Sequence, residues 1–207
     1  MSSRVLVGDV FEDIGKAGEL LSPELIVMGT HGAQGFQKVF GSNAIKMISN
    51  SSSPFLITQG KKTVDKIKTI VMPFSFDKNT IQITKFAASM AKRFNATVHL
   101  VGYHDEDEWL EKHMKSNQNI VKNHFDEKGV NYEIANIAIG NNYNNELLAY
   151  AKKVDADLLA AGYFQEGIIT NPKSFIQFMI ENELNLPLLT VNAEDLFVSK
   201  GHFMFNA

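Results

Sequence analysis

The sequence contains no cysteine, and this absence excludes several kinds of chemistry at once. Disulfide bonds, thiolate metal sites and cysteine nucleophiles all require a sulfhydryl group. Long apolar runs are also absent, because no uninterrupted stretch approaches the roughly 20 residues that span a bilayer. The start of the chain, MSSRVLVGDV, lacks the apolar core and the small-residue cleavage site of a signal peptide. We therefore expect a cytoplasmic protein without a membrane partner.

An excess of positive charge is missing as well. The 207 residues carry a formal net charge of −3, and a pI of about 6.1 argues against a nucleic-acid partner. Hydrophobic residues make up 44% of the chain and charged residues 21%, which is typical of a globular protein with an adequate core. The length exceeds that of one average domain and is short for two.

Short apolar runs alternate with helical patterns along the chain. A run rich in β-branched residues predicts a strand, and apolar residues that recur every three to four positions predict a helix. The predicted strands cover residues 4–9, 25–29, 54–58, 67–74, 96–103, 131–140, 157–162 and 187–192. The predicted helices cover residues 11–21, 42–50, 78–95, 105–128, 145–154 and 174–182. Strands separated by helices pair in parallel through right-handed crossovers, which indicates an open α/β sheet.

One predicted strand, LIVMG at residues 25–29, is apolar throughout. A continuous apolar run is expected of a strand that helices cover on both faces. We therefore expect this strand to be buried on both sides.

The chain also repeats itself. Residues 2–58 match residues 134–191 with an offset of 133 and one inserted residue, and the order of elements is the same in both copies. The spacing from Gly29 to Pro54 equals the spacing from Gly162 to Pro187. An equal spacing could arise by chance, but the shared order of elements favours a duplication.

The two copies differ in what precedes them. Residues 67–130 supply strand-helix-strand-helix before the second copy, whereas the first copy has no such stretch in this sequence. The expected units are a half copy at 1–59, a linker at 60–66, a complete copy at 67–193 and a tail at 194–207. In an alternative arrangement, a circular permutation, residues 67–130 would complete the first copy and leave the second without a partner. The contiguous arrangement is favoured because its contacts close shorter loops.

Two stretches of the sequence resemble the universal stress protein (UspA-like) family. ELIVMGTHGAQGFQKVFGSNAIKMISNSSSPFLIT resembles the closing half of its domains, and IKTIVMPFSFDKNT resembles their opening strand and first turn. The resemblance covers residues 4–59 and 67–192. It implies a Rossmann-like, adenine nucleotide alpha hydrolase-like fold: an open, parallel five-stranded sheet with helices on both faces, present as one complete copy plus one half copy. It also implies that dimers or tandem pairs join through their final strands.

The resemblance further implies a phosphate-binding loop. Family members that bind ATP use Gly-x-x-Gly followed by Gly-Ser or Gly-Thr, which here correspond to Gly29, Gly32, Gly41 and Ser42, with Asn43 in the same turn. Glycines let backbone amides approach phosphate oxygens, and the start of a helix favours anions. The spacing between the two glycine pairs is one residue shorter than in the family. Alternatively, the glycines serve tight turns and Ser42 is an ordinary helix N-cap.

Neither copy retains every part of that site. The first copy lacks the opening strand that brings an aspartate toward the nucleoside, so we expect it to hold a phosphate or sulfate anion at most. In the second copy Ser75 stands where the family has that aspartate, although Asp77 lies nearby. Gln165 and Phe175 replace the loop glycine and the serine, so we expect no nucleotide there.

The remaining candidate residues each have a structural interpretation as well as a functional one. The acidic residues 105–108 open a predicted helix, where negative charge is favourable, and metal binding is the alternative. His113 and His124 can share one face of that helix, but no further ligand pattern accompanies them. His31 could touch a phosphate or be solvated, and the apolar tail is expected to pack on a domain or a partner.

No catalytic constellation is recognisable in the sequence. We therefore expect a non-catalytic stress-response binding module, most simply a homodimer, with a partial ATP phosphate loop. The alternative is a nucleotide-hydrolysing or phosphotransfer enzyme on the same fold.

Overall fold

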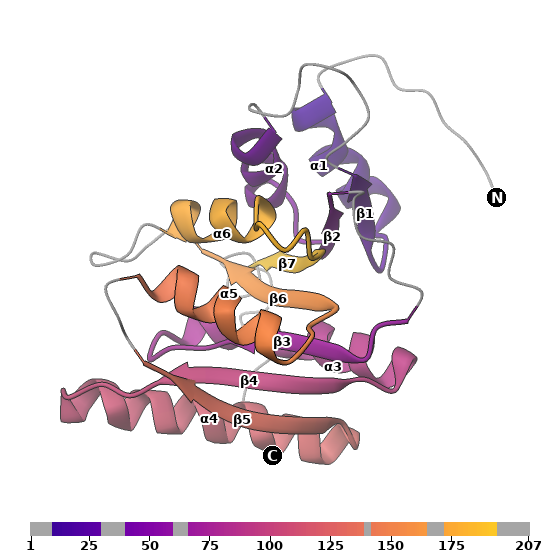
Figure 1. The fold of residues 1–207 in the computed structure, drawn as a ribbon. Coiled ribbons are helices and arrows are strands. Elements are labelled where there is room, and N and C mark those ends of the chain that lie inside the picture. The colour runs from indigo at the N-terminus through magenta and orange to yellow at the C-terminus, as the bar shows by residue number, and fades with distance from the viewer. Residues whose placement is uncertain (1–9, 30–39, 60–65, 139–141, 165–171, 194–207) are drawn as a thin grey trace.

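The fold is built on one sheet of seven strands, seen in a computed structural model that describes residues 10–29, 40–59, 66–138, 142–164 and 172–193 (Figure 1). The strands are β1 Ile26–Gly29, β2 Phe55–Thr58, β3 Thr69–Pro73, β4 Thr97–Tyr103, β5 Asn131–Ile137, β6 Leu158–Tyr163 and β7 Leu188–Asn192. The helices are α1 Val10–Leu21, α2 Phe40–Ser49, the 3-10 helix η1 Lys78–Ile81, α3 Thr84–Phe94, α4 Glu108–Lys128, α5 Tyr143–Lys153 and α6 Pro172–Ile180. The predicted strand 4–9, most of the linker 60–66 and the tail 194–207 lie outside the described residues.

The strand order is β1-β2-β7-β6-β3-β4-β5. Every neighbouring pair is parallel except β2 and β7, which are antiparallel. The predicted open α/β fold is therefore confirmed. The details differ, because a single seven-stranded sheet replaces the expected five-stranded sheet with a separate half copy.

The pairing of β3 decides between the two arrangements considered from the sequence. β3 lies between β4 and β6, whereas β1 pairs only with β2 among the described strands. The circularly permuted arrangement would place β3 beside β1. It is therefore not the arrangement of this sheet.

Two hydrophobic cores lie on opposite faces of the sheet. One lies under α1, α2, α5 and α6, and the other under η1, α3 and α4. The central strands β6 and β7 are buried at every position. In the part of the chain that the structure describes, the helices on the second face come from residues 78–128, and they cover this face around β3 and β4 but not around β1.

β1 corrects the prediction of a strand buried on both faces. Ile26 and Met28 pack against the first core, but Val27 on the other face is 65% exposed. No helix among the described residues covers that face of β1. An apolar sequence is thus necessary for a doubly covered strand and not sufficient for one.

The expected helix 78–95 is also interrupted. Residues 78–81 form a 3-10 helix in which Gln82 N donates to Asn79 O, and the α-helix begins only at Thr84. The tighter turn places η1 against β6, where Asn79 O lies near Gly162. It also directs Ile83 fully into the core. Periodicity alone did not reveal this break because it depends on a tertiary contact.

The antiparallel junction between β2 and β7 is symmetric. Phe55 lies opposite Thr190 and Ile57 opposite Leu188, with Leu56 opposite Leu189 at the centre. Leu56 and Leu189 are themselves 133 positions apart, which is the offset between the two copies. A local two-fold axis therefore passes through this pair.

Two hydrogen bonds obey the same symmetry. Gln59 Nε2 donates to the carbonyl oxygen of Asn182 over 2.9 Å, and Asn192 Nδ2 donates to the carbonyl oxygen of Ser49 over 3.0 Å. Gln59 and Asn192 are 133 positions apart, as are Ser49 and Asn182. We call this pair of bonds the amide clamp. In each half, a side-chain amide just after or at the end of the last strand holds the end of the other half's helix segment.

Candidate functional site

The predicted phosphate loop begins at the carboxyl end of β1. Gly29, the last residue of this strand, is exposed, and a Cβ atom added there would meet no other atom within 4 Å. Gly32 and His31 lie outside the described residues. The described chain resumes at Phe40, where α2 begins.

The start of α2 differs from the prediction. The helix was expected to begin at Ser42, with this residue as its N-cap in the alternative interpretation, but it begins at Phe40 and includes Gly41, Ser42 and Asn43 in its first turn. The first four backbone N–H groups of an α-helix have no acceptor within the helix. At this helix start such donors lie among Phe40, Gly41 and Ser42, and the first turn contains no acidic residue that would repel an anion.

The corresponding position in the complete half is closed. Gly162, at the carboxyl side of β6, is buried, and an added Cβ atom would lie 3.0 Å from the backbone oxygen of Asn79 in η1. In open α/β sheets, ligands bind where the strand order reverses, and here that position lies between β3 and β6. η1 packs against β6 at this point.

The polar groups after β3 are paired with one another. Ser75 Oγ accepts from the backbone amide of Asp77 over 3.1 Å, and Asp77 Oδ1 accepts from the amide of Asn79 over 2.9 Å. Asp77 thus acts as the N-cap of η1. From α4, Asn117 Nδ2 donates to the carbonyl oxygens of Ser75 and Phe76. These bonds fix the turn in which Ser75 occupies the position of the family aspartate.

Aromatic side chains fill the space beside β4 and α6. The rings of Tyr103 and Tyr143 meet edge to face at 5.7 Å, and Phe175 lies 6.2 Å from Tyr143. Burial, with a smaller contribution from Tyr103, holds the pKa of Tyr143 well above its ordinary value. Phe175 therefore belongs to an apolar cluster, and Gln165 lies outside the described residues.

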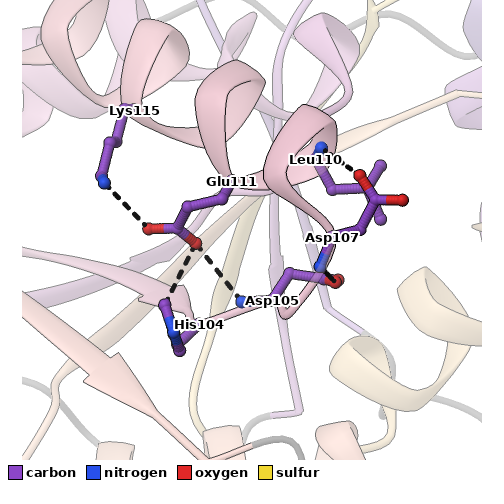
Figure 2. Close-up of polar contacts among 6 residues, drawn as sticks. All are labelled: His104, Asp105, Asp107, Leu110, Glu111 and Lys115. Carbon is purple, nitrogen blue, oxygen red and sulfur yellow. Dashed lines mark hydrogen bonds and ion pairs between the residues drawn. The ribbon is translucent and has the colours of Figure 1, made fainter.

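The acidic residues that precede α4 serve the helix start (Figure 2). Asp107 Oδ1 accepts from the amides of Trp109 and Leu110, and the α-helix begins at Glu108, not at Asp105 as expected. Asp105 Oδ1 in turn accepts from the amide of Asp107. The sequence predicted that these acidic residues place favourable negative charge at a helix start, and Asp107 has this role.

Glu111 joins this helix start to the end of β4. Its carboxylate accepts from Asp105 N and lies 3.2 Å from His104 Nδ1 and 3.5 Å from Lys115 Nζ (Figure 2). The hydrogen bond from Asp105 N, followed by the charge of His104 and the contacts with Lys115, lowers the pKa of Glu111. Within the described residues, no group of three or more histidine and carboxylate side chains is arranged to hold a metal ion.

The two helix histidines make separate contacts. His113 Nδ1 lies 2.7 Å from the carbonyl oxygen of Trp109, and its ring stacks on the Trp109 indole at 3.9 Å. Burial, followed by the charge of Lys128, lowers the pKa of His124. These contacts are separate, and they do not join the His113 and His124 side chains in one site.

Sequence reasoning did not find the amide clamp or the role of Asn117. The clamp could have been sought, because applying the offset of 133 to Gln59 gives another side-chain amide at Asn192. Asn117 offered no comparable signal. It lies inside a long helix, and its burial follows only from the position of the turn after β3.

The strand order, with helices on both faces, defines an open α/β protein of the class whose ligand sites lie at strand carboxyl ends. Residues 2–59 match the model of the universal stress protein family. No curated protein sequence matches the chain. In the part that the structure describes, no helix has the length and apolar character needed to cross a bilayer.

Solved structures extend this similarity to most of the chain. A universal stress protein from Archaeoglobus fulgidus DSM 4304 has a TM-score of 0.65 and 17% identity, and the match covers 89% of this chain and 66% of that protein. This chain therefore spans slightly less than two thirds of the relative's length. A putative universal stress protein from Pseudomonas aeruginosa UCBPP-PA14 has a TM-score of 0.60 and 15% identity, with coverage of 93% and 71%. A functionally unknown protein from Pseudomonas aeruginosa PAO1 gives the same values.

The resemblance to the universal stress protein family is thus confirmed. It is a match in sequence over residues 2–59 and a match in fold over most of the chain. The division into a half copy and a complete copy stays a prediction.

Proposed function

We propose that the chain is a non-catalytic, nucleotide-binding stress-response module, and that its phosphate-binding segment runs from Gly29 to Asn43. The observation that supports this proposal is an exposed, sterically open Gly29 at the end of β1, followed along the chain by the start of α2, which contains Gly41 and Ser42 and no acidic residue. The segment also lies within the residues that match the universal stress protein family. Backbone amides and a helix start favour an anion without needing a charged side chain.

The proposed ligand is the phosphate end of an adenine nucleotide such as ATP, or a free phosphate or sulfate ion. β1 has no strand beside its free edge among the described residues, so no opening-strand aspartate is present there to contact a nucleoside. In the complete half, Asp77 is engaged as a helix cap and η1 packs on Gly162. The proposal therefore places a single anion site in the half copy and no nucleotide in residues 67–193.

The proposal assigns no catalytic residue. A hydrolase or phosphotransferase needs a metal carboxylate and a positioned base, and the carboxylates of Asp77 and Asp107 are used as helix caps. We also propose a cytoplasmic location and self-association, most simply as a homodimer, because apolar Val27 of β1 is exposed in the described part of the chain.

The test is a calorimetric titration of the full chain with ATP and, separately, with inorganic phosphate. Gly32→Gln places at this position the residue that the second copy has at 165, and it should weaken binding of both ligands at least tenfold. Gly60→Gln, outside the motif, is the matched control and should bind as the wild type does. Equal binding by wild type and Gly32→Gln would contradict the proposal. Release of phosphate from ATP by the wild type, lost in Gly32→Gln, would favour the enzyme instead.

A further inference from the structure

A histidine lies inside the otherwise apolar stretch of β4. Val98, Leu100 and Val101 are fully buried, and His99 is buried among them. Among the side chains that the structure describes, His99 is the only buried one that can carry a positive charge. A polar group that is buried without hydrogen-bond partners costs free energy. The partners of His99 therefore decide which protonation states the folded protein can hold.

The sheet determines which elements surround this side chain. Alternate residues of a strand share one face, and Val101, two residues after His99, belongs to the core under α5. His99 therefore faces α5, on the side of the sheet opposite α4 (Figure 1). Its neighbours in register are Val71 on β3 and Glu133 on β5.

Two side chains approach the same ring nitrogen. His99 Nδ1 lies 2.9 Å from Tyr150 Oη on α5 and 3.9 Å from Glu133 Oε2. The side chain of His99 is 11% exposed and that of Glu133 is 67% exposed, so the carboxylate is largely in water. Burial, followed by the charge of Glu133, raises the pKa of Tyr150. The hydroxyl group therefore keeps its proton at neutral pH and can donate it to a neutral imidazole.

A hydroxyl group both donates and accepts, so the contact can exist in either direction. With a neutral His99, Tyr150 Oη donates to Nδ1, and the ring proton lies on Nε2. We infer that His99 is a proton-binding site of the folded protein, and that proton uptake reverses this hydrogen bond and thereby strengthens the attachment of α5 to the sheet. In the protonated state Nδ1–H donates to Tyr150 Oη, and Glu133 supplies the opposite charge. A hydrogen bond from a charged donor is about twice as strong as a neutral one.

The other charged groups around this contact are exposed or already engaged. β3 contributes only the uncharged Val71. On α5, Glu146 and Lys153 lie one turn before and after Tyr150, and both are exposed. Asp157, which precedes β6, accepts two backbone amides at the start of β3. The carboxylate on β5 is thus the one that the structure brings within ion-pair distance of the imidazole.

The inference goes beyond the proposed function and does not depend on it. The contact joins β4, β5 and α5, and none of these elements belongs to the proposed phosphate-binding segment, Gly29 to Asn43. Loss of anion binding would leave the contact as it is, and loss of the contact would leave that segment intact.

The test compares Tyr150→Phe with the wild type by urea unfolding in a basic and an acidic condition, about pH 8 and about pH 5.5, between which an imidazole ordinarily titrates. The substitution keeps the ring and removes only the oxygen. It should raise the unfolding equilibrium constant in both conditions, by a factor about five times larger in the acidic one, because a charged hydrogen bond is then lost. Tyr132→Phe is the matched control. The Tyr132 hydroxyl donates to Asp126, and an aspartate titrates below this range, so the effect should be the same in both conditions.

Further variants identify the groups that respond to pH. In a His99→Gln background, Tyr150→Phe should have the same effect in both conditions, because the titrating ring is gone. Glu133→Gln should raise the unfolding constant about twofold in the acidic condition only, since an exposed carboxylate contributes little. Glu146→Gln, on the exposed side of α5, is its control and should have no such effect.

Nitrogen NMR of the histidine rings provides a measurement that does not rely on stability. In the basic condition His99 should carry its proton on Nε2, with Nδ1 as an acceptor, and Tyr150→Phe should abolish this preference. The NMR result decides alone if the His99→Gln variants do not fold.

Three results would overturn the inference. They are an equal effect of Tyr150→Phe in the two conditions, a pH-dependent effect that persists without His99, and a ring proton on Nδ1 in the basic condition. Equal effects of Glu133→Gln and Glu146→Gln would overturn the assignment of Glu133 as the opposite charge.

Discussion

β1 and β6 occupy corresponding places in the two copies, yet their surroundings are opposite. Val27 is 65% exposed, whereas Ala160, at the corresponding position 133 residues later, is fully buried. Gly29 has open space around it, whereas Gly162 is in contact with η1. The local sequence unit is similar, and the difference comes from η1, α3 and α4, which in the described structure cover β6 and not β1. The burial of a residue in this fold therefore depends on which helices cover its strand.

The largest contrast is expected from a buried charge. Ala160→Lys would place an ammonium group in the core under α3 and α4, and we expect a loss of about 4 kcal/mol or more in the free energy of unfolding. Val27→Lys should change it by less than about 0.5 kcal/mol in a monomeric state. Urea unfolding of both variants, at a concentration where the wild type is monomeric, measures the difference. Similar losses in both would mean that the two strands are equally covered.

A smaller contrast is expected at the two glycines. Gly162→Val would force side-chain atoms against the backbone oxygen of Asn79, which cannot move as a flexible side chain can. Overpacking of this kind costs about 1–3 kcal/mol. Gly29→Val meets nothing and should cost under about 0.5 kcal/mol. The comparison is made by thermal unfolding, and a Gly162→Val variant as stable as Gly29→Val would show that η1 is displaced without cost.

The amide clamp tests whether the two halves contribute equally to their junction. Gln59→Leu and Asn192→Leu each remove a donor from a carbonyl group of the other half, and each should cost about 1 kcal/mol. Gln177→Leu removes an exposed hydrogen bond to Glu181 and should have little effect. Chemical denaturation of the three variants provides the measurement. If the two variants lost different amounts of unfolding free energy, the two hydrogen bonds would be equivalent in geometry but not in their contribution to stability.

The smallest effect concerns α4, which only the complete half has. Since the pKa of Glu111 is lowered in the folded protein, its contribution to stability is present above the ordinary pKa of a glutamate and is lost as the pH falls through the folded value. Glu111→Gln should therefore show a slightly flatter fall in melting temperature between neutral and acidic pH. Parallel curves for wild type and Glu111→Gln would contradict the assigned contacts.

The sequence predicted the main elements because their signals are local. Alternating strands and helices, and the offset of 133 between copies, follow from periodicity and spacing, and each predicted element that lies in the described residues is present at nearly the expected place. The exposure of Val27 could not be predicted from LIVMG, because burial depends on helices elsewhere in the chain. The interruption before Thr84 likewise accompanies a contact between η1 and β6, which are far apart in the sequence. The site was predicted only as a motif, since the packing of η1 on Gly162 brings together residues far apart in the sequence.

The single antiparallel junction also determines where the carboxyl ends of the strands lie. β1 and β2 run against the other five strands, so their carboxyl ends point to the opposite rim of the same sheet. The carboxyl end of β1 at Gly29 therefore lies at one rim of the sheet, while the carboxyl ends of β3 and β6 lie at the other. A partner bound at one rim would leave the other rim free, so the protein could bind two different ligands or partners at the same time.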